Sequence, residues 1–153
     1  MELEKRGAIK RINKLLASKE ISCKELTNKY IDEIEKSDLN AYVTMCKDKA
    51  LETAEKVDKK ISSGEKIGTL EGIPMTLKDN ISTTGIETKC CSKILKGYKP
   101  IYNATAWELL QNKGAVLLGK TNMDSKGAAR QTLFRQSVRG RVEKVDRDYI
   151  RRN

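Results

Sequence analysis

The feature that most constrains the fold is a short, wholly apolar segment late in the chain. Ala115, Val116, Leu117 and Leu118 form the longest uninterrupted aliphatic run, and Gly114 precedes them. A membrane-spanning helix needs roughly 20 apolar residues, so this run cannot form one. Its length and uniform apolar character are typical of a strand that is buried on both faces of a parallel sheet. We therefore expect a sheet flanked by helices.

Helical patterns elsewhere in the chain agree with such a sheet. Four stretches have apolar residues at the spacing of an amphipathic helix: Ile9, Ile12, Leu15 and Leu16; Leu26, Tyr30 and Ile34; Ala50, Ala54, Val57 and Ile61; and Trp107, Leu109 and Leu110. Ser22 and Glu25 have the spacing of a capping box before the second stretch. Asn103 or Thr105 is expected to cap the fourth. Residues 41–46 suit a strand, and helices alternating with short strands are typical of an α/β protein.

A second strand is expected to end at Lys78. Ile73, Met75 and Leu77 would share one face of this strand, and Lys78 would lie on the other face. Residues 81–103 contain several turn signals and suit an irregular connection. Connections of this length in compact proteins are often functional.

The absence of histidine restricts the chemistry that the chain can perform. It excludes histidine-dependent nucleophiles and histidine-ligated metal sites, so any general base must be Lys, Asp, Glu or Tyr. The cysteines Cys23, Cys46, Cys90 and Cys91 contain no Cys-x-x-Cys pair, so we expect reduced thiols and no metal site. The first ten residues lack the apolar segment of a secretory signal, so we expect a cytoplasmic protein without membrane contact.

The basic charge is concentrated at one end of the chain. The net charge is +10, of which residues 125–153 carry +6, from nine basic and three acidic residues, and residues 1–124 carry +4. Lysine outnumbers arginine 20 to 2 before Ser125, whereas arginine outnumbers lysine 7 to 2 from there on. We therefore divide the chain into residues 1–124 and an Arg-rich tail, residues 125–153.

Several interpretations of the Arg-rich tail remain open. Its apolar residues recur on one side of a helix, which would make it a basic amphipathic helix: Phe134, Val138, Val142, Val145 and Tyr149. Such a helix could contact RNA phosphates or bind a surface. The tail could instead be disordered, or it could be foreign or frame-shifted sequence.

Lys78 is the candidate catalytic residue. Most lysines are solvated surface groups, and a lysine amine with a pKa near 10.4 is a poor base at neutral pH. Burial that lowers this pKa by roughly 3 units would make it an effective one. Lys78 ends an apolar strand and precedes a long connection, so it suits a functional role better than most lysines of the chain.

Two motifs, in order, resemble the amidase signature family. The first is GIPMTLKDN over residues 72–80, and the second is GAVLLGKTNMD over residues 114–124. The intervening segments TGIET, CSKIL and YNAT most resemble the A subunits of glutamyl-tRNA(Gln) amidotransferases. The resemblance covers residues 1–124.

The resemblance implies a mixed α/β sheet and a triad of Ser, cis-Ser and Lys, in which Lys78 matches the lysine. The lysine amine would deprotonate one serine, which would activate the other to attack an amide carbonyl. In the A subunits the amide is glutamine, and the ammonia passes to a B subunit that amidates ATP-activated Glu-tRNA(Gln). The implied partners are the B and C subunits, with tRNA contacted through the complex. ATP and Mg²⁺ would act in the B subunit, whereas this chain would hold no cofactor.

The chain departs from the family after Asp124. The family continues with a segment similar to EFAMG and later with a Gly-Ser-rich stretch that carries both serines and the oxyanion-hole amides. This chain continues with SKGAAR and contains no Gly-Ser-rich element. We therefore expect a truncated fold that has the base, lacks the nucleophile and the oxyanion hole, and is inactive alone. Alternatives are a fragment of a free-standing amidase, or a non-catalytic protein that binds tRNA or a partner through the Arg-rich tail.

Overall fold

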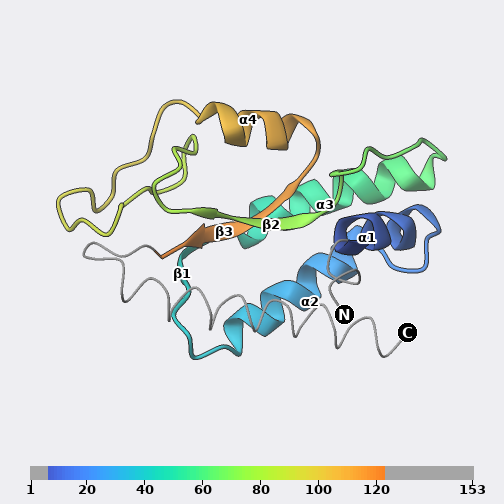
Figure 1. Cartoon of the computed structure of the whole chain (residues 1–153), viewed down its shortest axis with the longest axis horizontal. Helices are drawn as coiled ribbons and strands as arrows, with labels where there is room; N and C mark the ends of the chain where they lie inside the picture. Colours follow the sequence, from blue (N-terminus) through green and yellow to red (C-terminus); the bar gives the residue numbers. More distant parts are fainter. Residues whose placement is uncertain (1–6, 123–153) are drawn as a thin grey trace.

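The computed structural model describes residues 7–122 (Figure 1). Within this range lie four helices and three strands: α1 (Ala8–Ala17), α2 (Cys23–Glu35), β1 (Tyr42–Met45), α3 (Lys47–Ser62), β2 (Pro74–Lys78), α4 (Thr105–Asn112) and β3 (Val116–Thr121). This order confirms the expected α/β class and the helices and strands expected within residues 7–122. The predictions about the Arg-rich tail lie outside the described residues. Over residues 7–122, every helix is too short or too polar to span a bilayer.

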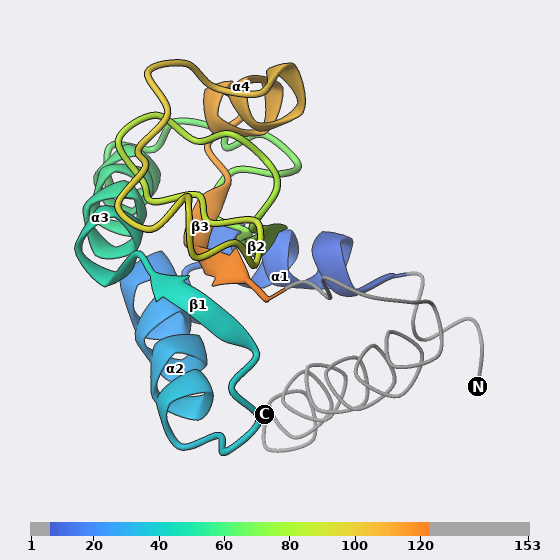
Figure 2. The ribbon, with the colours of Figure 1, turned by 90° about the vertical axis from the view of Figure 1, so that its left-hand side faces the viewer.

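The three strands form a mixed sheet with β3 in the centre. The strand order is β1-β3-β2, with β1 antiparallel and β2 parallel to β3. Five successive residues of β3, Val116 to Lys120, are buried. They are buried because both faces of the central strand are covered, as its apolar sequence predicts. Figures 1 and 2 both place α4 and the connection before it on one side of the strands and α2 on the other.

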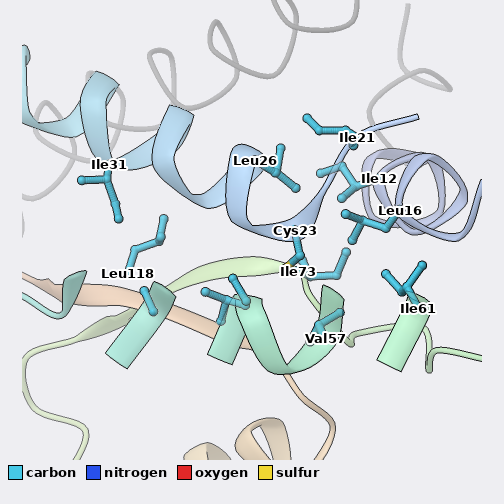
Figure 3. Packing of buried hydrophobic residues seen from close by; sticks show 13 residues of the cluster. Ile12, Leu16, Ile21, Cys23, Leu26, Ile31, Val57, Ile61, Ile73 and Leu118 are labelled. Atoms are coloured by element: carbon cyan, nitrogen blue, oxygen red, sulfur yellow. The ribbon is translucent and has the colours of Figure 1, made fainter. Parts of the chain in front are cut away.

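The larger core lies between the sheet and helices α1 to α3. Side chains from these helices, together with Ile21 before α2 and Ile73 before β2, meet Val116 and Leu118 of β3 in one cluster, much of which Figure 3 shows. The helical members are Ile12, Leu16, Cys23, Leu26, Ile31, Ala50, Ala54, Val57 and Ile61. Gly72 lies against this cluster with a φ of +77°. A Cβ atom there would lie 3.0 to 3.1 Å from the side chains of Leu16, Cys23 and Val57. The glycine that opens the first motif therefore lets the chain enter β2 close to the core.

A smaller core lies on the opposite face of the sheet, beneath α4. It consists of Cys46, Leu77, Ile86, Trp107 and Leu117, with Met75 packed against it. The prediction that Ile73 shares a face with Met75 and Leu77 is therefore wrong. Ile73 belongs to the larger core because it precedes the strand, in a turn where its amide donates to the Leu70 carbonyl at 3.2 Å.

The predicted helix starts were right for α2 and wrong for α4. Ser22 caps α2, and its Oγ accepts a hydrogen bond from the Glu25 amide at 3.0 Å. The N-cap of α4 is Ala104, which has no capping side chain. Thr105 already lies inside the helix, and the Oδ1 of Asn103 instead accepts from the Thr84 amide at 2.8 Å. Asn103 therefore closes the irregular connection rather than capping the helix.

Candidate functional site

Lys78 lies where two parallel strands end together. It is the last residue of β2, its side chain is half-buried, and it pairs in register with Thr121 of β3. The register between β2 and β3 shifts between Met75 and Thr76, which pairs Thr76 with Gly119. The carboxyl ends of adjacent parallel strands are a common position for functional groups. The structure thus places the predicted site residue at the end of its strand, as expected.

The face of the sheet that carries Thr76 and Lys78 is shaped by Tyr42 and Gly119. A Cβ atom on Gly119 would lie 2.4 Å from the Thr44 carbonyl oxygen and 3.0 Å from Cδ1 of Tyr42. Because Gly119 has no side chain, the ring of Tyr42 on β1 can lie against β3 at this position. Burial raises the pKa of Tyr42 to about 12, so its hydroxyl is neutral near pH 7.

The opposite face holds a buried charge pair of Lys120 and Asp79. Both residues are 0% exposed, and Nζ of Lys120 lies 4.0 Å from Oδ1 of Asp79. The ammonium donates hydrogen bonds to the Ile81 carbonyl at 2.6 Å and to Oγ1 of Thr88 at 3.2 Å. Burial lowers the pKa of Lys120, although the negative charge of Asp79 opposes this shift.

The Asp79 carboxylate also organises the connection that follows β2. Its Oδ2 accepts hydrogen bonds from the Lys89 and Cys90 amides, both at 3.1 Å. Its Oδ1 is buried without a hydrogen-bond partner among the described residues. Cys90 and Cys91 have φ values of +50° and +56°, which side-chain-bearing residues rarely adopt. Asp79 therefore holds the chain immediately before and within this strained turn.

Sequence reasoning singled out Lys78 as a candidate and did not single out the pair of Lys120 and Asp79. The signal was nevertheless present, since Lys120 follows a buried apolar run and Asp79 directly follows Lys78. The parallel arrangement of β2 and β3 brings the ends of both motifs to one edge of the sheet. Both residues therefore carry charge at the point where two apolar strands end, and the two charges are opposite.

The cysteines lie in two kinds of environment. None of the four, which all lie in the described part of the chain, forms a disulfide; Cys23 and Cys46 are buried, Cys90 is partly buried and Cys91 is exposed. Burial raises the pKa of Cys23 to about 12, which suppresses the reactive thiolate. In the described part of the chain, no group of three or more His, Cys, Asp or Glu side chains could hold a metal ion.

Comparison with known families decides the class of this fold. A family model described as Amidase matches residues 25–143. The chain belongs to the amidase family. The match runs past residue 124, where we expect the family part to end. That boundary stays a prediction because residues 123–153 lie outside the described part.

Curated relatives of this amidase-family chain include the A subunits of glutamyl-tRNA(Gln) amidotransferases. The chain is 46% identical over 119 residues to the one from Archaeoglobus fulgidus. It is 44% identical over 118 residues to the mitochondrial one from Homo sapiens. Each alignment covers 76% of this chain, but 25% and 22% of the respective relatives. The chain therefore spans about a quarter of the length of the curated relatives it matches.

Solved amidase structures confirm the fold class. Peptide amidase from Stenotrophomonas maltophilia aligns with a TM-score of 0.68 at 33% identity, covering 73% of this chain and 24% of that chain. A bacterial aryl acylamidase of the amidase signature family aligns with a TM-score of 0.70 at 32% identity, covering 74% and 24%. The amidase-family chain thus has the mixed α/β architecture of part of these enzymes.

Proposed function

We propose that this chain is the lysine-bearing N-terminal part of the glutamine-hydrolysing A subunit of an amidotransferase, with Lys78 as the triad base. The observation that carries the proposal is the position of Lys78 in the first motif, at the end of β2 beside β3. The side chain is half-buried, so a substrate or a partner serine can reach its amine. The buried Lys120 is the less suitable base because both of its hydrogen bonds hold it inside the fold.

Glutamine is the favoured amide among the substrates of the family. Eight curated relatives, at 41% to 47% identity, are all named as A subunits of glutamyl-tRNA(Gln) amidotransferases. The solved peptide amidase and aryl acylamidase are less similar, at 33% and 32% identity. This difference supports glutamine over the amides that free-standing amidases hydrolyse.

The proposed chemistry assigns one step to this chain. The amine of Lys78 would accept the proton of a serine hydroxyl, and that serine would in turn activate the nucleophile. This sequence contains no Gly-Ser-rich segment that could carry the two serines and the oxyanion-hole donors. We therefore propose that the 153-residue chain alone releases no ammonia from glutamine. The ammonia of the complete reaction would pass, in the cytoplasm, to a B subunit that uses ATP and Mg²⁺ to amidate Glu-tRNA(Gln), within a complex that also contains a C subunit.

A chimera tests the role of Lys78. Residues 1–122 of this chain would replace the matching quarter of the Archaeoglobus fulgidus relative, and glutaminase activity would be measured as ammonia release. We expect an active chimera in which Lys78→Met lowers kcat by about 10²- to 10⁴-fold, the usual contribution of a general base. Lys14→Met removes an exposed lysine of α1 and should leave the activity unchanged.

Two results would refute the proposal. One is a Lys78→Met chimera that hydrolyses glutamine at the rate of the unsubstituted chimera. The other is ammonia release by the purified 153-residue chain that disappears on Lys78→Met. The first would show that Lys78 is not the base. The second would show that the chain supplies its own nucleophile.

A further inference from the structure

Lys120 and Asp79 form a buried charge pair directly behind Lys78. Both side chains are 0% exposed, and the charged atoms are 4.0 Å apart. A buried ion pair often stabilises a fold no more than well-packed apolar side chains of similar volume. The pair is also imperfectly satisfied, because Oδ1 of Asp79 has no hydrogen-bond partner among the described residues. Stability alone is therefore a weak reason for charges at these two positions.

The ammonium of Lys120 is connected to Lys78 through one tight turn. The Ile81 amide donates to the Lys78 carbonyl at 3.0 Å, which closes a four-residue turn that begins at Lys78. The carbonyl of Ile81 accepts from Nζ of Lys120 at 2.6 Å. The same Nζ donates to Thr88, which lies further along the connection. Lys120 thus holds the far end of the turn in which Lys78 is the first residue.

Asp79 holds the other side of the same turn. Its amide donates to the Thr121 carbonyl at 3.0 Å, which extends the pairing of β2 with β3 by one residue. Its carboxylate accepts from the Lys89 and Cys90 amides at 3.1 Å each. Since Asp79 follows Lys78 directly, these bonds fix the peptide plane that the two residues share. The direction in which the Lys78 side chain leaves the backbone is fixed with it.

We infer that Lys120 and Asp79 are positioning residues that hold Lys78 at the end of β2 in one orientation. The inference rests on the proposed function for its catalytic meaning. The position of the Lys78 amine can be measured without an activity assay. Catalytic groups lose activity steeply when they are displaced, by about 10²-fold for a shift near 1 Å. A turn held at both ends by buried charged groups is suited to prevent such a shift.

The first test is competitive acetylation of the lysines in the full 153-residue chain, followed for each lysine by mass spectrometry. Lys120→Met keeps a long side chain but removes the donor to Ile81 and the partner charge of Asp79. Asp79→Asn keeps the shape and an acceptor for the loop amides but removes the charge. We expect both variants to raise the labelling rate of the half-buried Lys78 at least threefold. The exposed Lys14 serves as the internal reference.

The matched control is Lys24→Met. Lys24 forms an exposed ion pair with Glu55 at 2.6 Å, far from the turn in sequence. Its removal should leave the labelling rate of Lys78 unchanged. All variants are compared in buffer where urea titration shows them folded, so that global unfolding does not contribute. If Lys120→Met does not fold, Asp79→Asn alone decides. A wild-type labelling rate at Lys78 in the folded variants would overturn the inference.

The second test uses the glutaminase chimera. We expect Lys120→Met to lower kcat by about 10- to 100-fold with KM unchanged, because the base is displaced while the substrate pocket is not. A rise in KM with unchanged kcat would contradict the positioning role. The two proposals fail separately. If Lys78→Met has no effect in the chimera, the proposed function fails, whereas the labelling of Lys78 still reports whether Lys120 and Asp79 hold it.

Discussion

Strands β1 and β3 approach each other closely at Gly119, and Gly119→Ala tests how β1 is attached. The added Cβ atom would lie 2.4 Å from the Thr44 carbonyl oxygen and 3.3 Å from Cα of Met45. Both are backbone atoms of the β1 edge, so no side chain can rotate to relieve the contact. The strand must move away from β3, and the ring of Tyr42, whose Cδ1 would lie 3.0 Å from the added atom, must move with it.

The expected loss follows from two contributions. Overpacking a well-packed site costs about 1 to 3 kcal/mol. Replacing glycine stabilises the folded protein by about 0.4 to 1 kcal/mol, because the unfolded chain loses conformational freedom. We therefore expect Gly119→Ala to lower the free energy of unfolding by about 1 to 2 kcal/mol.

Urea denaturation measures this loss with an intrinsic probe. Trp107 is the only tryptophan of the chain, and it is 5% exposed in the smaller core against the sheet. Gly68→Ala is the control, because its Cβ would meet only the Glu71 side chain, at 3.6 Å and beyond. We expect this control to change the free energy of unfolding by less than about 0.5 kcal/mol. If Gly119→Ala is as stable as the control, β1 is not held against β3 as described.

The remaining predictions concern a helix cap and alkaline pH. Ser22→Ala removes the acceptor for the Glu25 amide at the start of α2, so the free energy of unfolding should fall by about 1 kcal/mol in the same urea assay; an unchanged midpoint would show that the cap contributes nothing. Burial raises the pKa of Cys23 from 9.0 and of Tyr42 from 10.0, both to about 12, so the folded state keeps protons that the unfolded chain releases. The stability that these two raised pKa values contribute is complete below pH 9 and is lost as the pH rises toward 12. Tyr42→Phe removes the part that comes from Tyr42, so the free energy of unfolding of this variant should fall less above pH 10 than that of the unsubstituted protein. Parallel pH profiles of the two proteins would contradict this.

The helices and strands were predictable where their signals are local. Apolar spacing located α1, α2 and α3, and the hydroxyl of Ser22 marked the start of α2. Prediction failed where a side chain had a choice of partners. Asn103 has the chemistry of a helix cap, but its Oδ1 accepts from Thr84, 19 residues away. Ile73 has the spacing of a strand residue, but the turn at Gly72 directs it into the other core.

The residues of the candidate site also differ in whether the sequence alone reveals them. Lys78 could be located from the sequence because the strand that it ends has its own apolar pattern. The buried pair could not, because Lys120 and Asp79 are 41 positions apart in the sequence, and only the parallel pairing of β2 with β3 makes them neighbours. The close approach of Tyr42 to Gly119 likewise depends on the pairing of β1 with β3.

By itself, the sequence determined which segments become helices and strands, that the sheet has a buried central strand, and which lysine ends a strand in a family motif. These properties follow from hydrophobic periodicity and short-range chemistry, which act over a few residues. Only the tertiary structure decided which lysine is buried, which carboxylate faces it, and how the turn after Lys78 is held. Burial and electrostatic interaction depend on distance in space, and that distance is set by the pairing of strands whose residues are remote in the chain.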